Sequence, residues 1–189
     1  MRALGDLLGA RKIGVTLLDS DRASSHALGV ALESPRLVHI ACHGVFIPDA
    51  PDRSGLVLLP APGKLELLSL RDLLTLDLRG LEQITLSSCW SADNFVLPGR
   101  RVVSLPETLM RAGAESIIGS LWPIADDVAL PLMTRFYGLL VAMERAEALR
   151  QVQLEMISGA LEGCRAPNLT SPRNWAGITL FGSADRLRI

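Results

Sequence analysis

The sequence predicts an α/β domain in which helices cover both faces of a mostly parallel β-sheet, with a small β-hairpin beside it. Short runs rich in β-branched residues alternate along the chain with stretches of helical periodicity, which is the pattern of a layered α/β fold. The 189 residues are 49% hydrophobic and 21% charged, which is enough apolar material for one sizeable core. We therefore expect a single domain over residues 1–189.

Five apolar runs predict the strands of the sheet, and two shorter runs predict the hairpin. The sheet strands are expected at 14–18, 37–41, 83–87, 116–120 and 175–181, and the hairpin strands at 56–59 and 64–67. The run at 37–41 has the apolar character of a parallel strand that is buried on both faces.

The helices are predicted from apolar spacing and from capping residues. They are expected at 24–32, from 69 to about 76, at 104–113, at 126–138 and at 144–161. Ser69 and Ser104 each precede an acidic residue three positions later, which is the pattern of a capping box. Pro131 falls early enough in its helix to be tolerated there.

Two segments lack periodicity and are predicted to be loops. Residues 43–55 are rich in Pro and Asp. Residues 91–103 include Arg100 and Arg101 and are expected to form a mobile loop directly behind Cys89. The two arginines are most simply solvated, although a loop near a reactive thiol could also control access to it.

The composition argues against nucleic-acid and membrane partners. The formal net charge is −1, with 19 basic and 20 acidic residues mixed along the chain, and only 4% of the residues are aromatic. We expect no secretory signal and no membrane span, since no uncharged stretch is long enough. Three widely spaced cysteines are expected to be free thiols. These features predict a soluble cytoplasmic protein.

No metal or organic cofactor is expected. The scattered Cys and His residues lack the paired spacing of a zinc site. The chain also contains no phosphate-binding loop, dinucleotide fingerprint or nucleophile-elbow serine motif.

Two reactive side chains follow two of the predicted strands. His43 follows the run at 37–41, and Cys89 follows the run at 83–87. Because the carboxyl ends of neighbouring parallel strands meet at one edge, the imidazole and the thiol could face each other there. An imidazole beside a thiol is the minimum that a cysteine nucleophile needs, since the thiolate attacks and the imidazole handles its proton. The leading function is therefore a cysteine peptidase.

Five motifs follow one another in a distinctive order. They are His39-Ile40-Ala41-Cys42-His43-Gly44, Ser54-Gly55-Leu56-Val57-Leu58, Leu86-Ser87-Ser88-Cys89, Ala112-Gly113-Ala114 followed by Ser120 to Asp127, and Trp175 to Gly182. Each motif is weak alone, but together they cover roughly residues 15–184. In this order they resemble a CHAT domain, which belongs to the caspase- and separase-like cysteine peptidases.

The resemblance implies a caspase-like three-layer sandwich and assigns roles to single residues. His43 is implied to be the catalytic histidine, Cys89 the nucleophile, and the backbone amides of Gly44 and Cys89 the oxyanion hole. Gly44 also lets the chain turn sharply enough to aim an amide at a developing oxyanion. The implied substrate is a protein or peptide, cleaved through a thioester. A regulatory domain or protein supplied in trans is implied to switch the activity on.

The sequence departs from the family pattern in two places. Cys89 is followed by Trp90, where the family usually has an acidic residue, so we expect Trp90 to affect substrate preference. The family also has a strand before the region that begins here at Met1, so this domain is expected to lack the first family strand. Either the chain is trimmed, another chain supplies that strand, or the domain is naturally short.

The acidic pair Asp126-Asp127 has two interpretations that can hold together. Carboxylates are favoured at a helix N-terminus, where they cap the helix or interact with its dipole. In separases, which the segment resembles, an aspartate here binds the basic side chain before the cleaved bond. A substrate pocket formed with Asp126 or Asp127 would then select Arg or Lys.

The remaining cysteines and histidines carry simpler expectations. Strand alternation turns Cys42 away from His43, so Cys42 is expected in the core. Cys164 has no assigned role, and His26 is expected to face solvent or to pack on its helix. Two other functions stay open, a catalytically silent CHAT-fold interaction module and another acyl-transfer enzyme with the same dyad.

Overall fold

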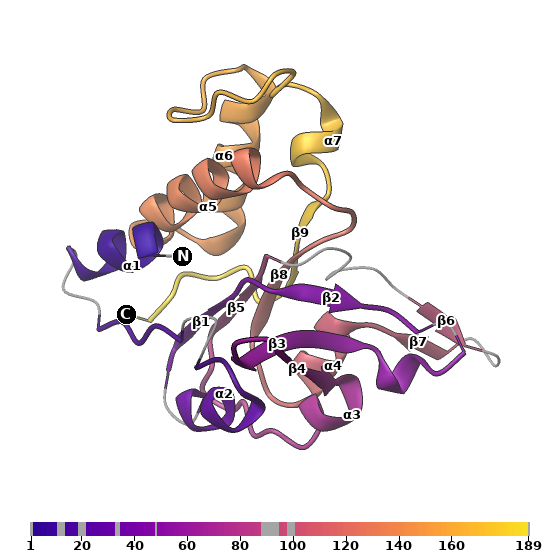
Figure 1. Cartoon of the computed structure of the whole chain (residues 1–189). Coiled ribbons are helices and arrows are strands. Elements are labelled where there is room, and N and C mark those ends of the chain that lie inside the picture. Colours follow the sequence, from indigo (N-terminus) through magenta and orange to yellow (C-terminus); the bar gives the residue numbers. More distant parts are fainter. Residues whose placement is uncertain are drawn as a thin grey trace.

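Four strands form the central sheet of the computed structural model, which describes residues 2–10, 14–18, 22–32, 35–47, 49–87, 95–97 and 101–188. The strands are β1 (Leu37–Ile40), β5 (Gln83–Leu86), β8 (Ser116–Ser120) and β9 (Ile178–Gly182), in the spatial order β1-β5-β8-β9. Strands β1, β5 and β8 run parallel, and β9 pairs antiparallel with β8 (Figure 1). The mostly parallel sheet expected from the sequence is confirmed.

Helices cover both faces of this sheet, so the fold is a caspase-like three-layer sandwich (Figure 1). One layer holds α1 (Arg2–Gly9), α5 (Asp126–Leu140), α6 (Arg145–Ile157) and α7 (Pro172–Trp175). The other layer holds α2 (Ser25–Ala31), α3 (Leu70–Leu73) and α4 (Leu105–Arg111). Ile117 and Ile118 show the alternation that makes this possible, because these fully buried neighbours on β8 belong to cores on opposite faces.

A second, antiparallel sheet lies beside the first and contains the predicted hairpin. It consists of β2 (His43–Val45), β3 (Gly55–Ala61) and β4 (Lys64–Ser69) in the order β2-β3-β4. The hairpin turn contains Gly63 at φ +73, a conformation that glycine adopts without a steric penalty. Leu56 and Leu68 face the core, while the opposite face of the sheet exposes apolar side chains such as Leu65.

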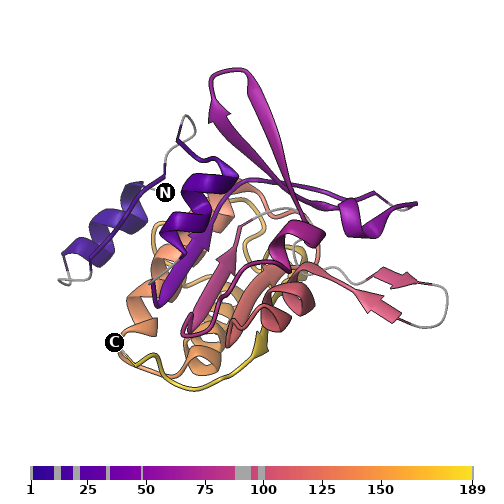
Figure 2. The same ribbon diagram turned by 90° about the horizontal axis from the view of Figure 1, so that it is seen from below.

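Three loop or strand predictions were wrong. Residues 43–55, predicted to be a loop, begin with β2, which forms because it pairs with β3 farther along the chain. The same segment also includes the 3-10 helix η1 (Pro51–Arg53). The predicted strand at 14–18 has no regular secondary structure and pairs with no described strand. Within 91–103, β6 (Phe95–Leu97) and β7 (Arg101–Val103) pair antiparallel and project from the sandwich (Figure 2). Residues 88–94 and 98–100 lie outside the described part of the chain.

Helices α3 and α4 begin after the capping residues predicted for them. The Ser104 hydroxyl accepts a hydrogen bond from the Glu107 N–H at 3.2 Å, and Ser69 forms a full capping box with Asp72. Helix α6 ends at Ile157 rather than near residue 161, and Gly159 follows it at φ +73. A left-handed glycine at this position is a common helix stop.

Pro131 lies inside α5 and leaves one helical carbonyl without its usual donor. The missing N–H of Pro131 would have bonded the carbonyl of Asp127, four residues earlier. The Cys164 thiol instead donates to that carbonyl at 3.7 Å, a contact made by a weak donor. Cys164, which carries no predicted role, therefore helps α5 to accommodate its proline.

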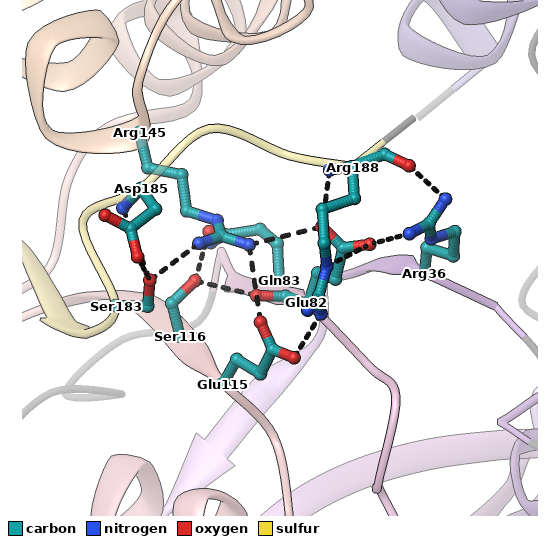
Figure 3. Close-up of polar contacts among 9 residues, drawn as sticks. All are labelled: Arg36, Glu82, Gln83, Glu115, Ser116, Arg145, Ser183, Asp185 and Arg188. Carbon is teal, nitrogen blue, oxygen red and sulfur yellow. Dashed lines mark hydrogen bonds and ion pairs between the residues drawn. The ribbon is translucent and has the colours of Figure 1, made fainter.

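A network of charged side chains closes the N-terminal edge of the parallel strands (Figure 3). Its centre is the pair of Glu82 and Arg145, whose side chains are 0% and 1% exposed. Arg36 Nη2 lies 2.6 Å from Glu82 Oε1, and the backbone N–H of Arg188 donates to Glu82 Oε2 at 2.7 Å. Arg188 also pairs with Glu115, which lies 3.9 Å from Arg145.

The arginines compensate for the burial of the Glu82 carboxylate. Burial alone raises the pKa of Glu82, but the backbone hydrogen bond from Arg188 and the charges of Arg36 and Arg188 outweigh it. The pKa therefore lies below its ordinary value, and Glu82 is ionised at neutral pH. A buried charge of this kind is tolerated only while its partners remain in place.

We expect Arg145→Met to lower the free energy of unfolding by about 3–5 kcal/mol, because it leaves the Glu82 charge buried with fewer partners. The matched control is Arg150→Met on the same helix, where Arg150 forms an exposed ion pair with Glu147. Exposed pairs contribute roughly 0–1 kcal/mol. Urea unfolding followed by circular dichroism measures both variants, and equal losses in the two would contradict the importance of the buried network.

Candidate active site

Strands β1 and β5 bring two predicted site segments to the same edge of the sheet. The strands pair in parallel register from Leu37 with Gln83 to Ile40 with Leu86. The Ser87 N–H continues this pairing by donating to the Ile40 carbonyl at 2.8 Å. His43 follows Ile40 by three residues, and Cys89 follows Leu86 by three residues. Cys89 itself lies outside the described residues.

His43 is exposed at the start of β2, where it pairs with Val57 of β3. Gly44 follows opposite Leu56 and is partly buried. The alternation of β2 puts His43 on the outer face of the small sheet, together with exposed Val45. The imidazole is thus exposed to solvent, three residues beyond the end of β1.

Cys42 faces the other way and is unsuited to act as a nucleophile. Its side chain packs against the core on the α3 and α4 side. Burial raises the pKa of Cys42 to about 11, although a backbone hydrogen bond from Val57 opposes the shift. The thiol is therefore protonated at neutral pH, and the prediction that Cys42 is a core residue is confirmed.

Asp126 and Asp127 begin α5, which follows β8 and starts at the same edge of the sheet. Both carboxylates are exposed. Ala125 occupies the capping position and makes no side-chain hydrogen bond to the helix, so neither aspartate is the cap. Their location in the first turn still favours negative charge through the helix dipole. Trp90, the third predicted substrate contact, lies outside the described residues.

Trp122 is an aromatic side chain at this edge that received no role from the sequence. It follows β8, and its indole N–H donates to the Arg173 carbonyl at 2.7 Å. Gly177 leaves the space for the ring, since a Cβ there would lie 2.6 Å from an indole carbon. The glycine directly before the last strand was the signal that could have indicated this close contact.

A buried polar contact between β1 and α5 was also not predicted from the sequence. His39 Nδ1 and the Tyr137 hydroxyl oxygen lie 3.0 Å apart in a hydrogen bond whose donor depends on the His39 tautomer. The Thr85 side chain hydrogen-bonds the same phenol. Burial lowers the pKa of His39 to about 4, so its imidazole is neutral at pH 7. A histidine within an apolar strand was the feature of the sequence that could have indicated a buried polar contact.

The lowered pKa of His39 predicts that the protein loses stability in mild acid. This pKa is about 4 when folded against an ordinary 6.5, so below pH 6.5 the unfolded chain binds a proton that the folded chain does not. Stability therefore falls as the pH drops from 6.5 to 4, by about 1.4 kcal/mol per pH unit at most.

Urea unfolding at several pH values in this range checks the prediction. We expect His39→Gln to flatten the acid slope, whereas His26→Gln, at an exposed histidine, should leave it unchanged. Equal slopes for the wild type and His39→Gln would show that His39 does not titrate as described.

The described residues contain no group of three or more His, Cys, Asp or Glu side chains arranged to hold a metal ion. Among the described helices, none is both long and apolar enough to cross a bilayer.

Comparison with known proteins gives a family match over most of the chain. The CHAT domain model matches residues 1–183. Tetratricopeptide repeat protein 28 of Mus musculus is 30% identical over 126 residues, which are 64% of this chain and 5% of that protein. The Homo sapiens protein of the same name is 26% identical over 155 residues, which are 82% of this chain and 6% of that protein.

The family match agrees with the motif order and with the three-layer sandwich. The roles of single residues stay predictions. The chain belongs to the CHAT domain family.

Proposed function

We propose that this domain is a cysteine endopeptidase that cleaves a partner protein with His43 and Cys89 as its catalytic dyad. The observation that supports the proposal is the register of β1 and β5, which end together at one edge, three residues before His43 and Cys89 respectively. His43 is exposed there, as a group that exchanges protons with a substrate must be.

The reaction follows from the chemistry of the dyad. His43 takes the proton of the Cys89 thiol, and the thiolate attacks the carbonyl carbon of the peptide bond. The backbone amides of Gly44 and Cys89 are proposed to hold the resulting oxyanion. The intermediate collapses to a thioester as the amine leaves with a proton from His43. Water then attacks the thioester, which releases the second fragment and regenerates the thiol.

The substrate pocket is proposed to prefer Arg or Lys before the cleaved bond. Asp126 and Asp127 are exposed and begin α5 at the same edge as His43. A carboxylate pairs strongly with a basic side chain, whereas an apolar side chain leaves it unpaired. Trp90 follows the nucleophile directly and is proposed to contact the same part of the substrate.

We also propose that a neighbouring domain or a partner supplied in trans regulates the activity. The chain matches only 5–6% of the length of its curated relatives, whose name refers to tetratricopeptide repeats. Repeats of this kind form extended surfaces that bind other proteins. In such an arrangement the repeats would bind the signal or the substrate, and the domain described here would cleave it.

A catalytically silent interaction module is the second candidate function. The observation that favours it is the apolar outer face of the small sheet, where Val45, Leu65 and Leu67 are exposed. Apolar side chains clustered on one exposed face often mark a protein contact. This alternative needs no reactive thiol, so the two candidates separate cleanly in a labelling experiment.

The first test replaces each member of the dyad. We expect Cys89→Ala and His43→Ala each to lower peptide cleavage by roughly 10³-fold or more, because the nucleophile and its base act as one unit. A thiol-reactive peptide probe should label Cys89 but neither Cys42 nor Cys164, with Cys164→Ser as the matched control. Near-normal turnover in either dyad variant would reject the dyad assignment, and no labelling of Cys89 together with no cleavage by the wild type would reject the peptidase in favour of the silent module.

The second test concerns the acidic pair. Mass spectrometry of a digested peptide library should show cuts after Arg or Lys in the wild type, and this preference should weaken in Asp126→Ala or Asp127→Ala. Asp49→Ala is a suitable control, since Asp49 is exposed and lies on the loop after β2. A wild-type profile dominated by Leu, Met or Asp would leave the pair with its helix-dipole role alone.

A further inference from the structure

The inward face of β5 is polar where the surrounding core is apolar. Gln83 and Thr85 are fully buried on the side of the sheet that faces α5 and α6. Ser116 of β8 lies 2.6 Å from the Gln83 amide oxygen, and its hydroxyl also contacts the Glu82 carbonyl at 2.9 Å. Hydrogen bonds from Ser116 thus connect β5 to the neighbouring strand β8, next to the charged network at the N-terminal end of β5 (Figure 3).

Tyr137 provides the contact farther along the same face. Its side chain is 1% exposed on α5, and its hydroxyl bonds both His39 of β1 and Thr85 of β5. His39 and Thr85 are partners in the parallel register, so one phenol bridges two adjacent strands and a helix. Met133 and Phe136, which lie near it on α5, belong to the apolar core on this side of the sheet.

A phenylalanine in place of Tyr137 could fill the same volume, so packing alone does not explain the hydroxyl. Burying three polar groups together is unfavourable unless each is hydrogen-bonded. Apolar packing also tolerates small slips and tilts that a hydrogen bond does not. The hydroxyl therefore adds directional precision to the way α5 sits on β1 and β5.

The three bridged elements are the ones that lead to the proposed site. His43 lies four residues after His39, and Cys89 lies four residues after Thr85. Asp127 lies ten residues before Tyr137 on α5, which corresponds to about 15 Å of helix. A small tilt at Tyr137 would therefore displace the ends of β1, β5 and α5 that lead to the site.

We propose that Tyr137 is a positioning residue, whose hydroxyl fixes β1, β5 and α5 so that His43 and Cys89 keep the separation that proton transfer needs. This inference rests on the proposed function. Tyr137 touches no substrate and exchanges no proton in the reaction. Its contribution is to the geometry of the dyad, so its loss should lower kcat rather than weaken substrate binding.

The test removes the hydroxyl and keeps the ring. We expect Tyr137→Phe to lower kcat about tenfold or more with KM changed less than about twofold, since small misplacements of reacting groups are costly. Thr85→Val should lower kcat by a smaller factor, since it keeps the contact between Tyr137 and His39. The double variant should lose no more than Tyr137→Phe alone, because Tyr137→Phe already removes the contact with Thr85. Thr134→Val is the matched control, since it deletes a hydroxyl on α5 that bonds the Leu130 carbonyl of its own helix.

The outcomes separate this inference from the proposed function. If the wild type cleaves peptides and Tyr137→Phe retains its kcat, the positioning role is wrong while the peptidase stands. Should Tyr137→Phe fail to fold, a folded Thr85→Val with unchanged kcat overturns the inference equally. If the wild type cleaves nothing and its Cys89 reacts with iodoacetamide no faster than Cys164, the proposed function fails and the inference fails with it.

Discussion

The buried carboxylate of Glu82 is the constraint on which the arrangement of this domain depends. An ionised carboxylate without solvent must be surrounded by donors, and these come from segments far apart in the sequence. Arg36 precedes β1, Arg145 begins α6, and Arg188 belongs to the C-terminal segment. One side chain thereby holds the start of β5 against the neighbouring strand, a covering helix and the last described residues of the chain.

The two edges of the sheet consequently differ in character. The N-terminal edge is closed by paired charges with little exposed surface at its centre. At the carboxyl edge lie the exposed groups His43, Asp126 and Asp127, for which the described part of the chain forms no comparable network. Sheets of this topology usually bind ligands at the carboxyl edge. Rigidity at one edge and accessibility at the other suit an enzyme that must present reactive groups from fixed strand ends.

The sequence predicted what local patterns encode and missed what distant residues create together. Strand β8 and the capping of α4 by Ser104 follow from neighbouring residues, and both were predicted correctly. The pairing of β2 with β3 and of β6 with β7 depends on partners that no periodicity reveals. The edge that carries His43 could be predicted because parallel strands end together. The contact between His39 and Tyr137 could not, since 98 residues separate them.

The fixed indole of Trp122 gives this domain an optical property of practical use. The ring packs against Gly177, its N–H is bonded to the Arg173 carbonyl, and part of it remains accessible to solvent. Indole emission depends on the polarity around the ring, and here the ring cannot turn to escape a change in its surroundings. With Trp90 and Trp175 replaced by phenylalanine, the remaining fluorescence would come from a single emitter at the carboxyl edge, where it could report on occupancy without an added label.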